Sequence, residues 1–256
     1  MKTVLTFALF LASLAANMAQ EPLKVGMELS YPPFEMTDLR GNPSGISVEI
    51  AQALGRHLGR SVVIQNVSFD GLIPALKTGK IDLILSSMTA TEERSRSISF
   101  SDPYLTTGLC LLVPKLSPVS DITDLDAKGK KIAVKKGTTG HLYATRHLKN
   151  ASLLVLDKES AAVLEVLQDK ADAFIYDQMS VFQHAQKHPE QLRALLRPFQ
   201  TESWAIGLAP GDTTLKIQVN AFLAAYRKEG GFDRLGEKYL KEPKAAFKLQ
   251  GVPFVF

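Results

Sequence analysis

The chain has 256 residues, of which 45% are hydrophobic and 22% are charged. This composition is that of a globular protein and excludes a disordered, a collagen-like or a coiled-coil chain. The length allows one large domain or two compact lobes around a cleft. The formal net charge of +4 is too small to indicate a polyanionic partner by itself.

The N-terminus has the pattern of a secretory signal peptide. A basic residue precedes an apolar run from Val4 to Ala16, which is shorter than the about 20 apolar residues that usually span a bilayer. Small residues allow cleavage after Ala15 or Ala19, and we take residues 1–19 as the signal peptide. A buried N-terminal helix is the alternative, but the polar break at Gln20 to Pro22 favours export.

The single cysteine, Cys110, lies within the apolar run from Leu109 to Val113. One cysteine excludes an intrachain disulfide, and its apolar neighbours predict a buried thiol. No cysteine lies near the cleavage region, so we expect no lipid anchor.

One basic cluster occurs in the middle of the chain, and its members are Lys128, Lys130, Lys131, Lys135 and Lys136. It has neither interleaved aromatic residues nor a nucleic-acid-binding motif. We interpret the cluster as a solvated strand edge and predict no nucleic-acid partner.

Short β-type runs alternate with amphipathic helical runs along the chain. Strands are predicted at Leu23–Met27, Val62–Gln65, Ile81–Leu85, Ser97–Phe100, Leu109–Val113, Lys131–Val134, Leu153–Leu156, Ala171–Tyr176 and Trp204–Leu208. This alternation is typical of open α/β folds, in which helices cover both faces of mostly parallel sheets.

Two sheets are favoured over one. Proline, serine and aspartate are frequent in residues 114–129 and break the chain near its middle. After Trp204 only one strand and two helices, at 213–228 and 232–240, are predicted, so this part should return to the first lobe. The predicted lobes are residues 22–107 plus 204–242 and residues 108–203, with an unassigned tail at 243–256.

Ligands of open parallel sheets bind beyond the carboxyl ends of the strands, where this chain places hydroxyl, aromatic and charged side chains. The first lobe offers Glu28, Tyr31, Ser86, Ser87, Thr89 and Arg94 at such ends, and the second offers Thr138, Thr139 and Asp177. A guanidinium holds a carboxylate with two parallel hydrogen bonds, and an aspartate accepts from an ammonium. This set predicts a site for an α-amino-acid zwitterion.

The chain resembles the polar amino-acid-binding proteins of bacterial ABC importers, the family 3 extracellular solute-binding proteins. The matching stretches are Tyr31–Glu35, Gly45–Glu49, Phe69–Leu76, Gly79–Asp82, Ser86–Arg94, Phe100–Tyr104, Gly137–Thr139 and Ala171–Ala173. The resemblance covers about residues 23 to 239. It implies a two-lobed type II periplasmic-binding-protein fold with two crossing strands. It also implies a monomeric, non-enzymatic receptor that closes on an L-amino acid and delivers it to an inner-membrane permease with its ATPase.

The resemblance also implies roles for side chains of the first lobe. Tyr31 and Phe69 would sandwich the side chain of the ligand. Ser86, Ser87 and Thr89 would bind its α-amino and α-carboxylate groups.

Charged groups and helix-start amides would complete the site. By the same resemblance Arg94 would clamp the carboxylate, Thr138 and Thr139 would add amides, and Asp177 would take the ammonium. Glu28 would then be left as an unbalanced acid that meets the distal group of the ligand, and burial of an unpaired carboxylate is costly. We therefore expect a cationic ligand such as arginine, lysine, ornithine or histidine, with glutamine as an alternative.

Simpler structural roles exist for the charged residues. Arg94 could form a surface ion pair with Glu92 or Glu93, and Asp177 could cap the helix that begins near Gln178.

The aromatic and hydroxyl side chains also have simpler roles. Tyr31 and Phe69 could be core residues, although Pro32 and Pro33 argue against burial of Tyr31 in a strand. The hydroxyls could cap the helix that starts at Thr91.

The remaining motifs predict no metal and no cofactor. His184 and His188 have the spacing of a metal-ligand pair but lack a third ligand in the sequence pattern.

The main alternative function is a cyclohexadienyl dehydratase on the same scaffold, which takes prephenate or arogenate and would use Glu28 or Glu202 as its acid.

Overall fold

The structure is a computed structural model and describes residues 21–252. The predicted signal peptide and the last four residues of the predicted tail lie outside the described residues. The strands are Leu23–Met27 (β1), Ser30–Tyr31 (β2), Glu35–Thr37 (β3), Pro43–Ser44 (β4), Val62–Asn66 (β5), Leu83–Ile84 (β6), Ser99–Pro114 (β7), Lys131–Lys135 (β8), Ser152–Leu156 (β9), Ala173–Asp177 (β10) and Leu192–Leu208 (β11).

Helices follow most of these strands. The α-helices are Ile46–Leu58 (α1), Leu72–Lys77 (α2), Glu92–Ser95 (α3), Thr139–His147 (α4), Glu159–Leu167 (α5), Gln178–Lys187 (α6), Thr213–Lys228 (α7), Gly231–Tyr239 (α8) and Lys241–Leu249 (α9). Two 3₁₀ helices, Phe69–Gly71 (η1) and Ile122–Leu125 (η2), complete the set. The predicted α/β fold class is therefore confirmed.

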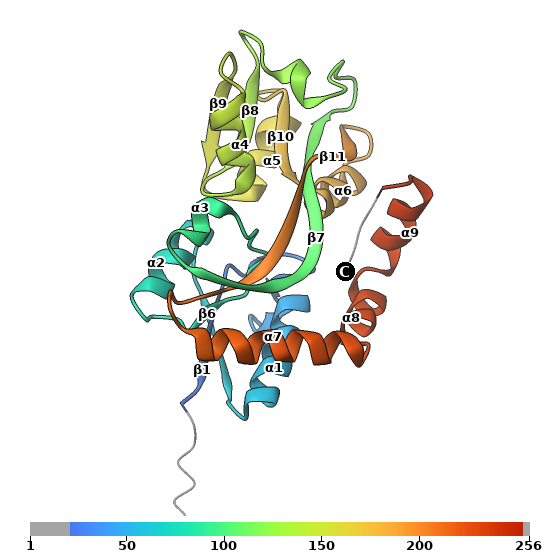
Figure 1. Cartoon of the computed structure of the whole chain (residues 1–256). Helices are drawn as coiled ribbons and strands as arrows, with labels where there is room; N and C mark the ends of the chain where they lie inside the picture. Colours follow the sequence, from blue (N-terminus) through green and yellow to red (C-terminus); the bar gives the residue numbers. More distant parts are fainter. Residues whose placement is uncertain (1–20, 253–256) are drawn as a thin grey trace, which may run out of the picture.

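Two long strands join the two lobes. The main sheet has the order β5-β1-β6-β11-β7-β10-β8-β9. β1 pairs in parallel with β5 and β6 in one lobe, and β8 pairs in parallel with β9 and β10 in the other. β7 and β11 pair antiparallel and run through both lobes (Figure 1). The two predicted sheets are thus hydrogen bonded into one through the two crossing strands.

β7 differs from the prediction because it is one strand where the pattern indicated two. Polar residues and Pro103 interrupt the apolar pattern between the predicted halves. Pairing with β11 keeps this stretch extended, and shifts of register near Ala205 accommodate the proline, which has no N–H to donate. The predicted lobe boundaries fall within β7 and at the Ser203–Trp204 step of β11.

Amphipathic helices position the loops of the site against the sheet. In α1 the side chains of Ile46, Ile50 and Leu54 are fully buried at helical spacing. Gly59 ends this helix in the left-handed conformation (φ 68°), which glycine adopts without a steric penalty. α7 occupies the residues predicted for it and packs against α1 and β7.

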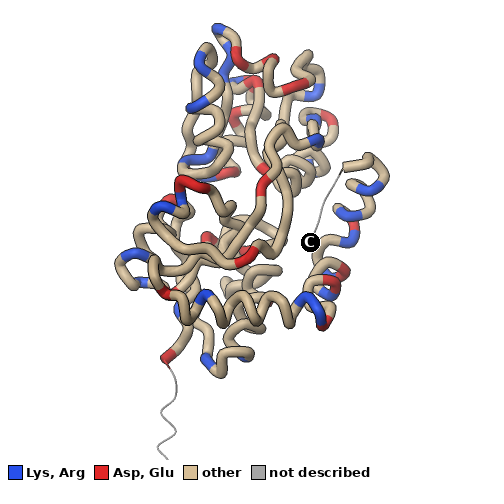
Figure 2. Tube along the Cα trace, viewed as in Figure 1, with Lys and Arg blue, Asp and Glu red and all other residues tan. Residues whose placement is uncertain are grey.

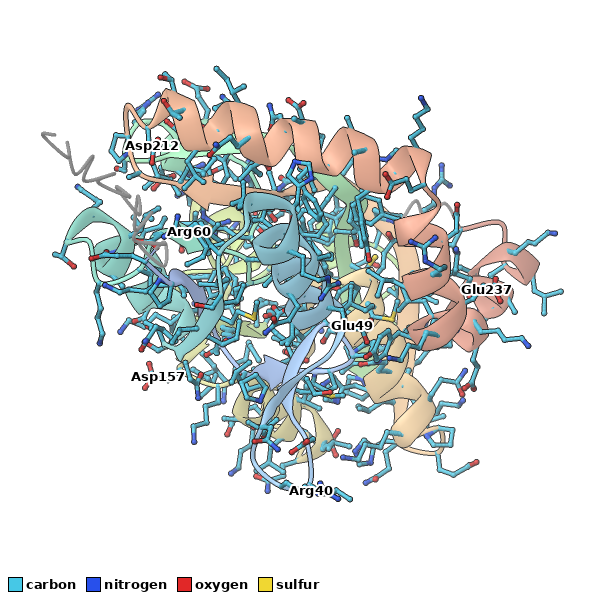
Figure 3. All side chains as sticks on the ribbon, turned by 90° about the horizontal axis from the view of Figure 1, so that it is seen from below. Arg40, Glu49, Arg60, Asp157, Asp212 and Glu237 are labelled. Carbon is cyan, nitrogen blue, oxygen red and sulfur yellow. The ribbon has the colours of Figure 1, made fainter. Side chains whose placement is uncertain are left out.

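The C-terminal part forms a helix that the sequence pattern did not predict. Phe247 of α9 is 1% exposed and packs edge-on against Phe182 of α6, with ring centroids 5.1 Å apart. α8, just before it, is tied to α1 because Lys238 and Tyr239 both donate to Oε1 of Glu49, at 2.6 and 2.5 Å. Figure 3 labels Glu49 on α1 and Glu237 on α8. The unassigned tail is therefore structured up to Leu249.

The surface carries mixed charge. Lysines and arginines are interspersed with acids over both lobes (Figure 2). Within residues 21–252 no helix combines the length and the hydrophobicity needed to cross a bilayer. Cys110 is fully buried, as predicted, and burial raises the pKa of its thiol.

Candidate ligand-binding site

A cavity of about 30 Å³ lies between the two lobes. All ten residues predicted for the site contribute to its lining, and they are Glu28, Tyr31, Phe69, Ser86, Ser87, Thr89, Arg94, Thr138, Thr139 and Asp177. The sequence analysis did not assign to the ligand site six further lining residues, Glu35, Leu109, Gly140, Tyr176, Glu202 and Trp204. Chain folding thus gathers residues from several strand ends and from the crossing strands β7 and β11 around one small space.

Arg94 reaches from the first lobe to the second. Its side chain is 6% exposed, and its guanidinium donates to the backbone oxygens of Thr89 at 2.7 Å and of Gly137 at 3.0 Å. Burial lowers the pKa of Arg94 to about 10, an effect that Glu202 partly opposes, so the guanidinium stays charged at neutral pH. Gly137 occupies the left-handed region (φ 75°), and a Cβ there would lie 3.2 Å from the Asp70 side chain.

The surface ion pair considered for Arg94 is not present. Glu92 pairs with Arg96 at 2.9 Å, and Glu93 pairs with Arg146. These partners leave Arg94 to face the cavity, consistent with the role implied by the resemblance.

Asp177 both caps a helix and lines the cavity. Its Oδ1 accepts from the backbone N–H groups of Met179 at 3.0 Å and Ser180 at 3.3 Å, and from the hydroxyl of Tyr31 at 2.6 Å. Its Oδ2 accepts no hydrogen bond within the part of the chain that the structure describes. Burial raises the pKa of Asp177 to about 7, while the Tyr31 hydrogen bond acts in the opposite direction. Within the described residues, Oδ1 therefore accepts all the hydrogen bonds that the structure gives to the Asp177 carboxyl group.

Tyr31 is buried in a strand, contrary to the argument from the prolines. It ends the two-residue strand β2, so the prolines that follow need not donate to a ladder. Its ring stacks on Phe34 with centroids 5.5 Å apart and meets Trp204 edge-on at 6.1 Å. Tyr31 thus belongs to the core with its ring and to the site with its hydroxyl.

Glu35 is a buried acid that the sequence analysis did not assign to the site. Its carboxylate accepts from the hydroxyls of Ser47 at 2.6 Å, Ser87 at 3.1 Å and Ser86 at 3.4 Å. Burial raises the pKa of Glu35 to about 8, although these three hydrogen bonds lower it. Its place at the end of the Tyr31–Glu35 stretch, which carries the family resemblance, could have indicated a role at the site. Its burial could not be predicted, because a charged residue in a short strand gives no sign of it.

Glu202 of β11 joins hydroxyls from the two lobes. Its Oε2 accepts from Thr89 Oγ1 and from Thr139 Oγ1, both at 2.9 Å, and its Oε1 accepts from Gln200 at 3.0 Å. Burial raises the pKa of Glu202 despite these bonds and the nearby guanidinium of Arg94. Thr89 is therefore engaged at the site and does not cap a helix.

Ser86 and Ser87, which could have capped the helix that starts near Thr91, contact Glu35 instead. Thr91 caps α3 by accepting from the backbone N–H of Arg94 at 3.2 Å. In the second lobe Thr138 does cap α4, accepting from the backbone N–H of His141 at 3.3 Å, and donates to the backbone oxygen of Lys135 at 2.7 Å.

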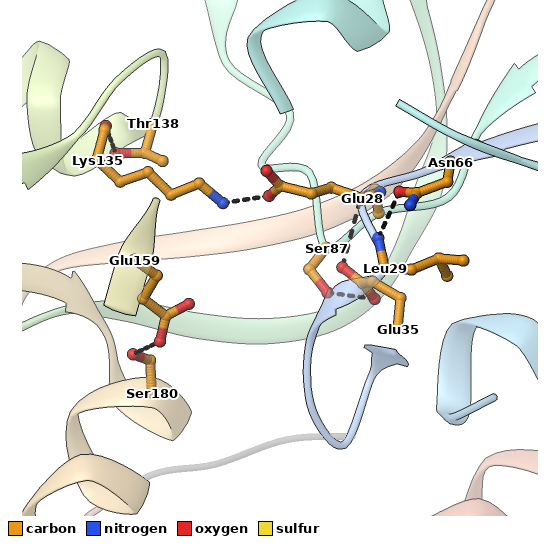
Figure 4. A network of polar contacts seen from close by, with 10 residues as sticks. Glu28, Leu29, Glu35, Asn66, Ser87, Lys135, Thr138, Glu159 and Ser180 are labelled. Carbon is orange, nitrogen blue, oxygen red and sulfur yellow. Dashed lines mark hydrogen bonds and ion pairs between the residues drawn. The ribbon is translucent and has the colours of Figure 1, made fainter. Parts of the chain in front are cut away.

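Lys135 corrects two expectations. It is only 2% exposed, so this member of the basic cluster is not part of a solvated strand edge. Its Nζ forms an ion pair with Glu28 across the two lobes, so Glu28 is not an unbalanced acid (Figure 4). The Phe69 ring lies against two cations, with its centroid 5.4 Å from Arg94 Cζ and 5.5 Å from Lys135 Nζ.

One member of the histidine pair contacts an acidic side chain. His184 Nε2 lies 2.9 Å from Oε1 of Glu159, which also accepts from Ser180 at 2.6 Å. Among the described residues no group of three or more histidine, cysteine or acidic side chains could hold a metal ion.

Comparison with known proteins gives the family. The model of the bacterial extracellular solute-binding proteins, family 3, matches residues 23–242. The L-arginine-binding protein of Pseudomonas aeruginosa is 32% identical over 91% of this chain and 93% of its own. The L-cystine-binding protein TcyJ of Escherichia coli is 28% identical over 85% of this chain and 82% of its own.

A solved structure agrees with these matches. An ancestral amino acid-binding protein, a precursor of cyclohexadienyl dehydratase, superimposes with a TM-score of 0.80 and 33% identity over 86% of this chain and 95% of its own. The chain therefore belongs to the bacterial extracellular solute-binding proteins, family 3.

Proposed function

We propose that the protein is a periplasmic receptor that captures one L-α-amino acid and delivers it to an ABC importer. The observation that carries this proposal is the meeting of Arg94 and Asp177 at one cavity from opposite lobes. A buried guanidinium suits an α-carboxylate, and the unused Oδ2 of Asp177 suits an α-ammonium. Relatives that bind arginine and cystine support the same ligand class.

Capture requires the lobes to separate. The cavity of about 30 Å³ holds one or two water molecules, far less than an amino acid. Contacts between the lobes, such as those of Arg94 with Gly137 and of Tyr31 with Asp177, close over this space. An amino acid that bridges the lobes stabilises the closed form, while β7 and β11 take up the rotation.

The hinge of this receptor lies in the two crossing strands. One moving body comprises residues 22–107 plus 204–242, and the other comprises residues 108–203. Both breaks fall in the crossing strands, where a small change in backbone angles rotates one lobe against the other.

The charges of the cavity favour a ligand with a cationic group in its side chain. Four carboxyl groups line the space, but Lys135 balances that of Glu28, and the pKa of Glu35, raised to about 8, keeps that group largely protonated at neutral pH. Asp177 and Glu202 remain against the single lining guanidinium of Arg94. A cationic group offsets part of this acidic excess in a poorly solvated site.

A dehydratase activity is the alternative, and the geometry of the acids argues against it. The two candidate acids are both engaged, since Glu28 pairs with Lys135 and Glu202 accepts from three side chains. A general acid needs its proton within reach of the leaving hydroxyl. Turnover of prephenate or arogenate by the purified protein would overturn the receptor assignment.

Calorimetric titration tests the proposal. The mature protein, stripped of bound ligand by unfolding and refolding, is titrated with the twenty L-amino acids, ornithine and citrulline. Saturable binding of one of them at a 1:1 ratio supports the receptor. If none of them binds, the proposal fails and the dehydratase assay comes next.

A further inference from the structure

A buried ion pair lies beside the ligand cavity, and its acid, Glu28, lines the cavity. Glu28 follows β1 in one lobe, Lys135 ends β8 in the other, and their side chains are 16% and 2% exposed. Figure 4 shows the lysine side chain extended across the cleft to this carboxylate. The pair therefore places one positive and one negative group beside the cavity. The ring of Phe69, which also lines the cavity, has its centroid 5.5 Å from Lys135 Nζ and 5.4 Å from Arg94 Cζ.

A ligand with only a cation at its far end does not suit this arrangement. A cation that reaches Glu28 competes with Lys135 for the carboxylate. The lysine is then left buried without a partner, which is a costly outcome in a protein interior. Glu35 gives it little compensation, because the raised pKa of Glu35 keeps that carboxyl largely protonated at neutral pH.

A ligand with an ammonium and a carboxylate at its far end meets both groups. Its ammonium takes the place of Lys135 at Glu28, and its carboxylate takes the place of Glu28 at Lys135. Two buried charges thus exchange one partner for another, and neither is left unpaired.

The structure also offers room beyond the pair. A second cavity, of about 400 Å³, shares Glu28 with the ligand cavity. On its other sides it is lined by Ser30 and Pro32 from the first lobe and by Lys158 and His184 from the second. A ligand longer than a common amino acid can therefore extend past Glu28 between the lobes.

We infer that the preferred ligand is a diamino dicarboxylic acid, an amino acid whose side chain ends in a second ammonium and a second carboxylate. This inference rests on the proposed receptor function. Arg94 and Asp177 hold one zwitterionic end, and Lys135 and Glu28 hold the other.

Matched ligands and matched variants test the inference. Meso-2,6-diaminopimelate differs from L-lysine by one carboxylate on the side-chain end, and L-cystine offers a longer spacing between two such ends. Calorimetric titration of the ligand-stripped protein with these compounds, L-arginine and L-glutamine gives the order of affinities. We expect one of the two diamino dicarboxylates to bind at least about tenfold more tightly than lysine and arginine, about the effect of one charge-assisted hydrogen bond.

Lys135→Met removes the charge and keeps the length of the side chain. We expect it to abolish the preference for the diamino dicarboxylate over lysine. Lys131→Met, at the exposed start of the same strand, is the control and should leave the order unchanged. If Lys135→Met does not fold because Glu28 lacks its partner, the double variant Glu28→Gln, Lys135→Met leaves no unpaired charge and should bind neither class preferentially.

The outcomes separate the inference from the function it rests on. The inference is overturned if lysine, arginine or glutamine binds as tightly as the tighter of the two diamino dicarboxylates, or if the ratio is unchanged in the Lys135 variants. Either result leaves the receptor in place. Absence of binding by these compounds and by all the amino acids of the titration described above overturns the receptor itself.

Discussion

The hydroxyl of Tyr31 donates a 2.6 Å hydrogen bond to Oδ1 of Asp177, which lies 146 residues further along the chain. The two residues belong to opposite lobes, so under the proposed hinge motion this bond forms only in the closed state. It also supports the charged form of a buried carboxylate, since hydrogen bonds to a carboxylate lower its pKa.

Loss of the tyrosine hydroxyl should therefore change the titration of Asp177. We expect Tyr31→Phe to raise the pKa of Asp177 above its value of about 7, because burial then acts with one opposing hydrogen bond fewer. The carboxyl ¹³C resonance of Asp177, followed by NMR against pH, measures this. Tyr143→Phe, which removes a hydroxyl elsewhere in the second lobe, is the control, and an unchanged or lower pKa in Tyr31→Phe would contradict the expectation.

Two buried acids should make the protein less stable as the pH rises. The folded state raises the pKa of Glu35 from 4.5 to about 8 and that of Asp177 from 3.8 to about 7. Between these limits the folded protein binds more protons than the unfolded chain, so the free energy of unfolding falls with increasing pH.

Glu35→Gln should flatten this dependence, by up to about 1.4 kcal/mol per pH unit, because glutamine fills the same space without titrating. Urea unfolding of both proteins at pH 5 and pH 8 provides the comparison. Glu21→Gln, at an exposed position, serves as the control. An equally steep fall in Glu35→Gln and in the parent would show that Glu35 does not keep its proton.

Arg94 should be essential for affinity. Removal of one partner from a buried, hydrogen-bonded charge pair costs about 2–5 kcal/mol, so we expect Arg94→Ala to weaken binding of the cognate amino acid at least about 30-fold. Arg96→Ala removes a guanidinium two residues away that pairs with Glu92 at the surface, and its affinity should equal that of the parent. Calorimetric titration of both variants measures these affinities. If Arg94→Ala binds with the affinity of the parent, Arg94 does not bind the ligand.

The C-terminal helix should stabilise the whole protein. Phe247 is buried against Phe182, and truncation of a buried phenylalanine to alanine costs about 3–5 kcal/mol. We expect Phe247→Ala to lower the free energy of unfolding by about 3 kcal/mol in a urea titration. Leu249, on the same helix, is 89% exposed, so Leu249→Ala should have little effect, and equal stability of the two variants would show that α9 is not packed as described.

Local patterns in the sequence were sufficient for most elements and for nine of the ten predicted lining residues, whereas Phe69 was named from the family resemblance. The residues of β1 and α7 match their predicted ranges because the apolar repeat of each is carried by the segment itself. The lining residues could be named because parallel strands place their carboxyl ends on one edge, so strand order alone brings the following loops together.

Only the tertiary structure decided which charges are buried and what they face. Lys135 lies in a lysine-rich stretch and was expected in solvent, yet it pairs with Glu28, 107 residues away, once the lobes close. Glu35 in its short strand gave no sign of burial either. Helix and strand periodicity are local properties of a chain, whereas desolvation and the partner of a charge depend on segments that meet only in the folded state.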